Sequence, residues 1–324
     1  MNPTRPRRTV ADLAPLARAA LGPHRALTAV TRLRGGSKKG VYRLALDDST
    51  TAVAYLWSPD EDYWGEPEDD PRDPFSHASG LDLFTASHDR LAAAGVRTPR
   101  LLHVDRAAGA AVVEDLRDGS LEEALRRDPA AARTALEGLG EALRELRGCR
   151  ADGYGKVSLI DNGGSSYGTS CARTVADRAL ADIAETAGRD PRVAAARERL
   201  EAAVRSLTAA VKPRASHSLV HGELGPDHVL LDADGRAALI DIEGLMYFDA
   251  EWEHVFLRLR FGAHYDALRA PGLDEDRLRL YRLAMHLDLV AGPLRLLDGD
   301  FPLTESIRGI AEHNLAEALS LVES

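Results

Sequence analysis

The stretch 218–244 constrains the fold of this chain more than any other part of the sequence. Two short apolar runs, 219–220 and 229–231, are typical of buried strands, and a polar loop rich in turn-forming residues lies between them. A tight turn then leads to a third apolar run, which ends on Asp241. The pattern predicts a polar loop and a carboxylate side by side at the ends of short paired strands. The alternative is a structural turn whose polar side chains are solvated.

Length and charge narrow the classes of protein that this chain can be. Its 324 residues are enough for two lobes, because single hydrophobic cores stop growing at about 250–300 residues. The net charge of −10 argues against binding to duplex nucleic acid, and no apolar run approaches the roughly 18 residues of a membrane span. The two cysteines, Cys149 and Cys171, have no metal-binding spacing and indicate a reduced, cytoplasmic protein. The sequence leaves the oligomeric state open.

The first third of the chain has the pattern of an antiparallel sheet. Five segments have the composition of strands: 26–33, 41–46, 51–57, 100–103 and 110–113. Amphipathic helices are predicted at 9–21, with Thr9 as the N-cap, and at 75–94. A glycine-rich loop, 34–40, joins the first two strands, and an acidic loop, 58–74, is expected to be solvated. We therefore expect a five-stranded sheet with one inserted helix.

The rest of the chain is mostly helical. Amphipathic segments lie at 121–127, 129–146, 174–187, 191–211, 252–261, 274–297 and 303–321. A β-rich part followed by a helical part predicts an α+β fold with two lobes, a small one over residues 1–116 and a larger one over 117–324. A binding cleft is expected at the connector between them.

The polar loop has the spacing that phosphoryl transfer requires. That reaction needs a proton acceptor for the attacking hydroxyl, ligands for Mg²⁺ and a cover over the phosphates. Glu223 and His228 are five residues apart, as are the carboxylate and the metal-binding side chain of a protein-kinase catalytic loop. Asp241 follows the next strand, where a principal metal ligand is expected.

The same residues carry a resemblance to a known family. The segment His221-Gly-Glu-Leu-Gly-Pro-Asp-His resembles the His-Gly-Asp-x-x-x-x-Asn motif of the aminoglycoside phosphotransferase and choline kinase-like family. Ile240-Asp-Ile-Glu resembles its Ile-Asp-Trp-Glu metal motif, and Asp249 and Glu253 stand at the acids of its Gly-Asp-Pro-x-x-Asp motif. The resemblance extends from about Val30 to the final helices. It implies a protein-kinase-like fold with a small β-rich N-lobe and a larger helical C-lobe.

The resemblance also implies roles for individual residues. Glu223 would be the catalytic base, and His228 and Asp241 would bind Mg²⁺. The residues expected to bind ATP are Gly35, Gly36, Ser37, Lys38 and Lys39 of the glycine-rich loop and Glu114, Asp115 and Leu116 of the hinge. The acceptor would be a hydroxyl of a small molecule, such as an aminoglycoside-like antibiotic, an amino sugar, a nucleoside or a related metabolite.

This sequence differs from the family pattern at three positions that bear on catalysis and phosphate binding. Glu223 replaces an Asp, which moves the carboxylate by one methylene. His228 replaces an Asn and offers a ring nitrogen where Mg²⁺ prefers oxygen, although macrolide phosphotransferases resemble this pattern with His. The third-strand segment Ala52-Val-Ala-Tyr55 lacks the lysine that would contact phosphates. Three other cations are candidates for that role: Lys38, Lys39 and Arg43.

Alternative interpretations follow from these departures. A nucleotide-binding pseudokinase with a regulatory or scaffold role would also account for the missing lysine. Taken alone, the glycine-rich loop is more typical of a hairpin turn than of a cover over phosphates. Asp249 is the acid expected to anchor the catalytic loop. Four acids of the helical half predict either an acidic substrate pocket or a solvated face: Asp288, Asp298, Asp300 and Glu305.

Overall fold

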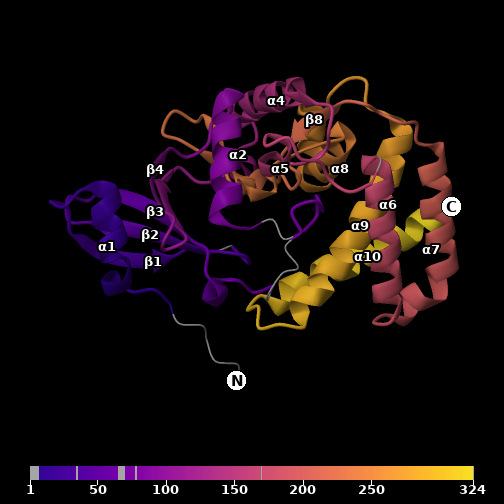
Figure 1. Ribbon diagram of the computed structural model, residues 1–324, viewed down its shortest axis with the longest axis horizontal. Coiled ribbons are helices and arrows are strands. Elements are labelled where there is room, and N and C mark those ends of the chain that lie inside the picture. The colour runs from indigo at the N-terminus through magenta and orange to yellow at the C-terminus, as the bar shows by residue number, and fades with distance from the viewer. Residues whose placement is uncertain (1–6, 34–35, 65–69, 77–78, 169, 324) are drawn as a thin grey trace. The chain divides into compact units, whose positions relative to one another are not determined.

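A computed structural model describes residues 7–33, 36–64, 70–76, 79–168 and 170–323 of the chain. The chain divides into two compact units, and each consists of three separate segments. Unit 1 comprises Met1–Asp69, His77–Ala142 and Pro226–Gly244, and unit 2 comprises Asp70–Ser76, Leu143–Gly225 and Leu245–Ser324. Unit 1 contains the largest sheet and helices predominate in unit 2, which confirms the α+β class (Figure 1).

Unit 1 is built on the expected five-stranded antiparallel sheet, with strand order β1-β2-β3-β5-β4. The strands are β1 (Leu27–Arg32), β2 (Gly40–Leu46), β3 (Thr51–Leu56), β4 (Leu101–Asp105) and β5 (Ala110–Glu114). The helices are α1 (Val10–Leu21), α2 (Leu81–Ala93), α3 (Leu121–Arg127) and the first part of α4 (Arg133–Gly148). The five strand predictions are therefore confirmed.

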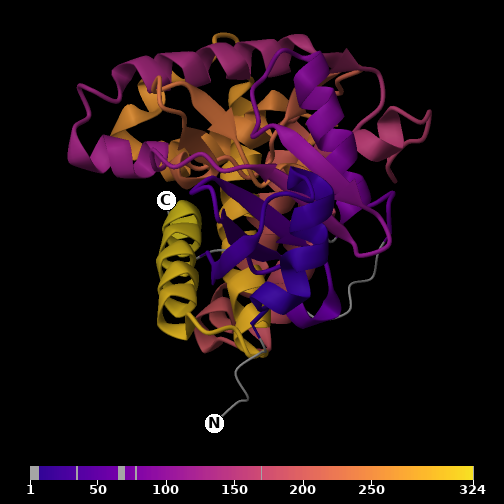
Figure 2. The ribbon, with the colours of Figure 1, turned by 90° about the vertical axis from the view of Figure 1, so that its left-hand side faces the viewer.

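The two faces of this sheet are covered by different helices. Successive side chains of a strand point to opposite faces, and Tyr42 and Leu44 are buried with Leu13 and Leu16 of α1. Figure 2 shows α1 in front of this face. Thr9 caps α1 in a reciprocal pair of hydrogen bonds with Asp12, as the sequence predicts. The opposite face carries Tyr55, and the ring of Phe84 in α2 meets its ring edge-on at 5.5 Å.

A small hairpin completes unit 1. Strand β9 (Val229–Leu231) pairs antiparallel with β10 (Ala237–Leu239), and short 3-10 turns precede and follow them at Pro226–His228 and Ile242–Gly244. The turn between the strands is held by Asp232, whose Oδ1 accepts hydrogen bonds from the backbone N–H groups of Asp234 and Arg236. This is the hairpin that the apolar runs on either side of the turn predict.

Unit 2 consists mainly of packed helices. They are α5 (Val157–Ile160), α6 (Cys171–Ala187), α7 (Pro191–Ala210), α8 (Ala250–Phe261), α9 (Glu275–Leu297) and α10 (Thr304–Glu323). Helix α9 packs against α6, α8 and α10, and Figures 1 and 2 show α10 beside it. Since Leu280, Tyr281 and Leu283 are all nearly fully buried, α9 is the central helix of this core.

A second sheet in unit 2 supports the polar loop. Its strand order is β6-β8-β11-β7, with β6 (Arg150–Ala151), β7 (Gly155–Lys156), β8 (His217–Val220) and β11 (Met246–Phe248). The two strands that flank the polar loop, β8 and β9, thus pair in different sheets. The helix expected over 75–94 begins only at Leu81 in the structure, and the ring of Phe75 instead packs on the rings of Phe248 and Trp252 in unit 2.

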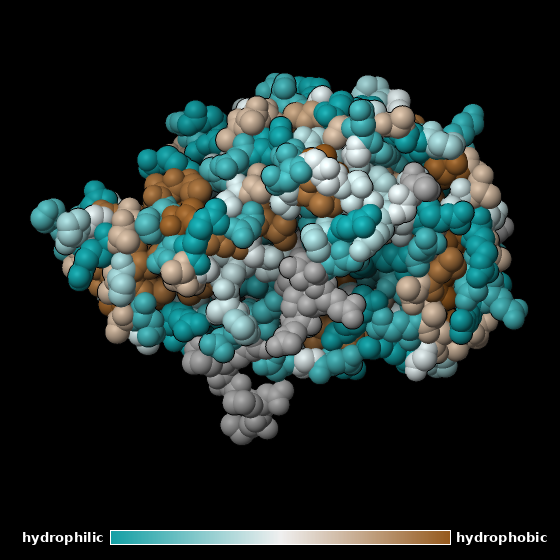
Figure 3. Space-filling view, viewed as in Figure 1, coloured by the Kyte–Doolittle hydropathy of each residue, from teal (hydrophilic) through white to brown (hydrophobic). Residues whose placement is uncertain are grey.

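Polar and charged residues cover most of the face drawn in Figure 3, and apolar residues appear in smaller groups between them. Among the helices that the structure describes, none combines the length and the apolar character needed to cross a membrane.

A buried carboxylate fixes the strand that follows the glycine-rich loop. Glu61 is fully buried, and it accepts a 2.6 Å hydrogen bond from the Tyr42 hydroxyl and pairs with Arg32 at 2.6 Å. Gly40 lies against this carboxyl, and a Cβ at that position would be 2.6 Å from the Glu61 Cδ. The end of the glycine-rich loop therefore depends on Glu61.

We expect Glu61→Ala to destabilise the protein by about 3–5 kcal/mol, because it leaves the mostly buried guanidinium of Arg32 without its carboxylate partner. Urea denaturation measures this change. Asp60→Ala is the matched control, since that side chain is 65% exposed, and it should change the free energy of unfolding by less than about 0.5 kcal/mol. Equal effects of the two substitutions would contradict this account of Glu61.

Candidate active site

The hairpin of unit 1 brings the two expected metal ligands together. His228 directly precedes β9 and Asp241 follows β10, so the pairing of the strands sets the two residues side by side. The backbone N–H of Ile240 donates to the His228 carbonyl at 3.0 Å. His228 Nε2 is 3.8 Å from Asp241 Oδ2. Asp241 has a φ of +59°, a left-handed conformation that Asp adopts more readily than most residues.

Asp241 also contacts a lysine from the glycine-rich loop. Lys39 Nζ lies 2.6 Å from Asp241 Oδ1 and 2.6 Å from Glu243 Oε1. The side chains of Lys39 and Glu243 are only 8% and 4% exposed, whereas that of Asp241 is 44% exposed. Burial disfavours the charged ammonium, but the two carboxylates outweigh it and hold the pKa of Lys39 above its ordinary value.

An aromatic pair occupies the position where the family pattern has a lysine. Tyr55 is buried on the face of β3 that Phe84 covers, and Lys39 Nζ is 5.5 Å from the centre of its ring. Burial raises the pKa of Tyr55 well above its ordinary value, so this hydroxyl is neutral. These three residues line one pocket together with His88, Asp241 and Glu243.

The remaining residues of the glycine-rich loop have other contacts. Gly35 lies outside the described residues, and Gly36 has a φ of +75°, which favours glycine. The Ser37 hydroxyl accepts a 2.8 Å hydrogen bond from the Trp64 ring nitrogen. Lys38 Nζ lies 5.7 Å from the centre of the same ring. Trp64 thus holds the middle of the loop, and Lys39 reaches the carboxylates.

The expected hinge begins where β5 ends. Glu114 is the last residue of that strand, and the side chain of Asp115 is 2% exposed. Arg43 makes a bidentate pair with Asp115, with Nε at 2.7 Å and a terminal nitrogen at 3.0 Å. Leu116 is buried beside it. The guanidinium of Arg43 is therefore engaged at the hinge.

Glu223, the expected base, belongs to a loop of unit 2 whose backbone is held by a buried side chain of α8. Glu223 is exposed, whereas the preceding His221 and Gly222 are buried. Glu253 of α8 accepts a 2.8 Å hydrogen bond from the Gly222 N–H, and the backbone of His221 also donates to it. Burial raises the pKa of Glu253 to about 7, against the lowering effect of these two donors. Glu253 was not identified as the anchor from the sequence.

The acid expected to anchor this loop, Asp249, has another role. It lies at the N-terminus of α8 and accepts hydrogen bonds from Arg277 at 2.8 Å and from the Tyr281 hydroxyl at 2.5 Å. Burial opposes its ionisation, but these bonds, with that from His217, hold its pKa well below the ordinary value. Asp249 therefore ties β8 and α8 to α9, and the prediction that it anchors the catalytic loop is wrong.

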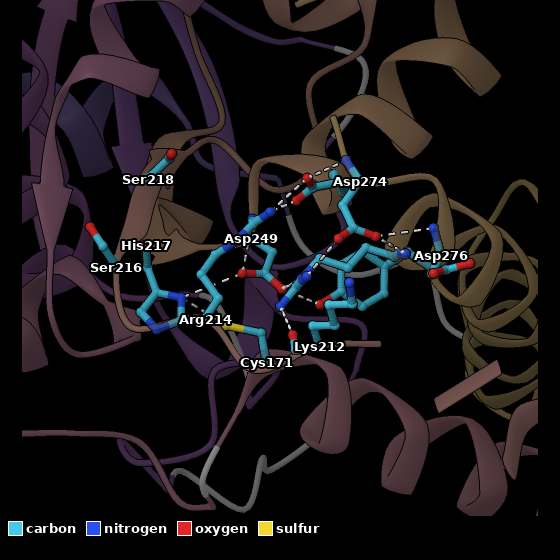
Figure 4. A network of polar contacts seen from close by, with 12 residues as sticks. Cys171, Lys212, Arg214, Ser216, His217, Ser218, Asp249, Asp274 and Asp276 are labelled. Atoms are coloured by element: carbon cyan, nitrogen blue, oxygen red, sulfur yellow. Dashed lines mark hydrogen bonds and ion pairs between the residues drawn. The ribbon is translucent and has the colours of Figure 1, made fainter. Parts of the chain in front are cut away.

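The same network contains a cluster with metal-ligating atoms. Those of Cys171, His217 and Asp249 all lie within 4.8 Å of one another. Arg214 contacts the Asp249 carboxylate at 3.3 Å (Figure 4), and Arg277 contacts it at 2.8 Å. Two guanidinium groups on one carboxylate repel a metal cation, so we interpret the cluster as structural.

Two of the four helical-half acids are paired with arginines. Asp288 accepts hydrogen bonds from Arg178 at 2.6 and 3.0 Å, and Asp298 pairs with Arg189 at 2.8 Å. Their charges are thus compensated within unit 2, which favours a paired surface over an acidic substrate pocket at these two positions.

The chain belongs to the phosphotransferase enzyme family, APH, because the sequence model of that family matches residues 29–287. This match confirms the resemblance seen in the motifs and the expected enzyme class, a phosphotransferase. No curated protein sequence matches the chain.

Solved structures of kinases share the fold. A thermostable mutant of the aminoglycoside phosphotransferase APH(4)-Ia, in ternary complex with AMP-PNP and hygromycin B, is 17% identical with a TM-score of 0.63, over 94% of this chain and 98% of that one. A choline/ethanolamine kinase family protein from Mesorhizobium loti is 20% identical with a TM-score of 0.56, over 97% and 93%. The choline kinase LicA from Streptococcus pneumoniae is 13% identical with a TM-score of 0.61, over 96% and 97%. The kinase-like fold is therefore confirmed.

Glu253→Gln isolates the protonation of the loop anchor. A carboxyl whose pKa is about 7 in the folded protein, above its ordinary 4.5, binds its proton more tightly when folded. Its contribution to stability is fully present below the unfolded pKa and is lost as the pH rises through the folded one. We expect the free energy of unfolding to fall more steeply in the wild type than in Glu253→Gln between about pH 5 and about pH 8.

Urea denaturation at several pH values measures these slopes. Glu305→Gln is the matched control, because Glu305 is exposed and its substitution should leave the wild-type slope unchanged. Parallel stability curves for the wild type and Glu253→Gln would show that the buried carboxyl does not titrate in this range.

Proposed function

We propose that this protein is an ATP-dependent kinase that phosphorylates a hydroxyl group of a small molecule. The observation that carries the proposal lies at the metal motif of a phosphotransferase family: Asp241 and Glu243 hold the Lys39 ammonium, and His228 lies beside Asp241. The use of a nucleotide is supported by the APH(4)-Ia structures, which contain AMP-PNP or ADP.

The residues present fit a magnesium ion. Mg²⁺ prefers oxygen ligands, and Asp241 offers a half-exposed carboxylate. The carboxylate oxygens of Asp241 and Glu243 already stabilise one cation, the Lys39 ammonium, so the site favours positive charge. His228 would be a weaker ligand through its ring nitrogen. When bound, Mg²⁺ would neutralise the charge that develops on the transferred phosphate.

Glu223 is the proposed proton acceptor. The acceptor hydroxyl gives its proton to the Glu223 carboxylate as its oxygen forms a bond to the γ-phosphorus, and the bond from that phosphorus to the leaving oxygen of ADP breaks. The products are a phosphate monoester and ADP. A displacement near 1 Å can cost about 10²-fold in rate. The hydrogen bonds that the backbone of His221 and Gly222 donates to Glu253 would therefore support catalysis by holding Glu223 in position.

The acceptor belongs to the hydroxylated small molecules: an aminoglycoside-like antibiotic, an amino sugar, a nucleoside or a related metabolite. The net charge of −10 mildly favours a cationic acceptor. ATP as donor and two free cysteines, Cys149 and Cys171, support a cytoplasmic reaction. With an antibiotic as the acceptor, the protein would confer resistance.

One observation favours a second candidate, a nucleotide-binding pseudokinase with a regulatory or scaffold role. Tyr55 and Phe84 fill the position where protein kinases have an ion pair of lysine and glutamate. Nucleotide binding without ADP release on any hydroxylated compound would support this candidate.

We expect Glu223→Gln to lower kcat by about 10²–10⁴-fold and to leave nucleotide affinity unchanged, because general-base catalysis contributes about that much. A coupled assay of ADP release, with a panel of hydroxylated compounds as acceptors, measures kcat. Glu198→Gln on α7 is the matched control, since Glu198 is exposed. A Glu223→Gln enzyme that works at the wild-type rate would exclude Glu223 as the base.

A further inference from the structure

We propose that the lysine that anchors the nucleotide phosphates has moved from β3 to the residue before β2, where Lys39, held by Glu243, takes over its role. This inference rests on the proposed kinase function and assigns a phosphate anchor to it. Tyr55 then fills the position that the lysine has left. Four observations within unit 1 support this assignment.

The usual position is occupied by an uncharged pair. In protein kinases a lysine on the third strand pairs with a glutamate on the helix that packs over it. Here β3 presents Tyr55, and α2 presents Phe84 to it edge-on at 5.5 Å. The α2 sequence, Leu81–Ala93, contains no glutamate. Neither member of the usual ion pair is therefore present at this place.

Lys39 brings an ammonium to the same place from the neighbouring strand. It directly precedes β2, which pairs with β3, and Tyr55 lies opposite Val41 in the register. Its Nζ is 5.5 Å from the centre of the Tyr55 ring, and both residues line one pocket together with Phe84. Lys39 thus places a positive charge beside the position on β3 where protein kinases have their lysine.

The three cations proposed to replace the lysine have different partners in the structure. Lys38 lies over the Trp64 ring at 5.7 Å, and Arg43 is paired with the buried Asp115 at the hinge. Lys39 alone among the three contacts the metal motif, at 2.6 Å from Asp241. The hypothesis that one of them replaces the lysine is thereby narrowed to Lys39.

Glu243 is the partner that positions Lys39. It is 4% exposed and 2.6 Å from the ammonium, and it takes the part that a glutamate of the packed helix has elsewhere. An ammonium has three N–H donors. Two of them serve Asp241 and Glu243, and the third can serve a phosphate oxygen. Because Glu243 is buried and Asp241 is half exposed, Glu243 can keep Lys39 in place while Asp241 binds a metal ion.

Calorimetric titration with AMP-PNP, with and without Mg²⁺, tests the assignment in the full-length protein. We expect Lys39→Met to weaken binding by about 10- to 100-fold, since a hydrogen bond to a charged group contributes about 1.5–3 kcal/mol. Lys38→Met should weaken it less. Lys212→Met is the matched control, because Lys212 is an exposed residue of unit 2, and it should bind like the wild type.

Two double variants keep the test decisive. Lys39→Met leaves the buried Glu243 carboxylate without its cation, and this variant can therefore unfold. The double variant Lys39→Met/Glu243→Gln removes both charges, so we expect it to fold and to report on nucleotide binding alone. Lys39→Met/Tyr55→Lys returns the lysine to β3 and should recover at least tenfold of the lost affinity, which a merely structural Lys39 would not allow.

The outcomes distinguish this inference from the function on which it rests. Wild-type affinity in Lys39→Met and in Lys39→Met/Glu243→Gln would overturn the role of Lys39, while a wild type that releases ADP would still be a kinase. Loss of affinity without recovery in Lys39→Met/Tyr55→Lys would also overturn the relocation. A wild type that binds no AMP-PNP would overturn the proposed function itself.

Discussion

The ion pair of Lys39 with Asp241 and Glu243 is the interaction on which unit 1 depends. It joins residues that are 202 and 204 apart in the sequence. A buried charge is costly unless it is paired, so the lysine and the two carboxylates must come together when the unit folds. The two carboxylates and the one ammonium together carry a net negative charge, and the side chain of Asp241 is half exposed. A second cation is the natural complement of that charge, which is why the cluster suits a magnesium ion.

Much of the architecture could be predicted from local patterns. The five strands of unit 1, the hairpin of β9 and β10 and the cap at Thr9 each follow from short-range alternation, turn residues or capping chemistry. The proximity of His228 and Asp241 follows from the same hairpin, because antiparallel pairing sets the residues that flank it side by side. Local sequence was sufficient wherever the contact closes within one hairpin or one helix turn.

Other features depend on contacts that no local pattern encodes. The sequence offered Lys38, Lys39 and Arg43 as equivalent cations, and only the tertiary contacts separate them. Asp249 and Glu253 are one helical turn apart at the start of α8, and the choice of loop anchor depends on which of them meets the backbone of Gly222. At both Glu223 and Glu253 the family motifs have an Asp, so the expected base and the side chain that holds its loop are each longer by one methylene.

A crystal structure of the protein with Mg²⁺ and AMP-PNP would show directly whether Lys39 anchors the nucleotide phosphates. We expect the Asp241 carboxylate to contact the metal ion, and Lys39 Nζ to donate hydrogen bonds both to Glu243 and to a phosphate oxygen. A bound nucleotide whose phosphates lie away from Lys39, with its ammonium still on Asp241 and the metal ion held by other residues, would contradict this expectation.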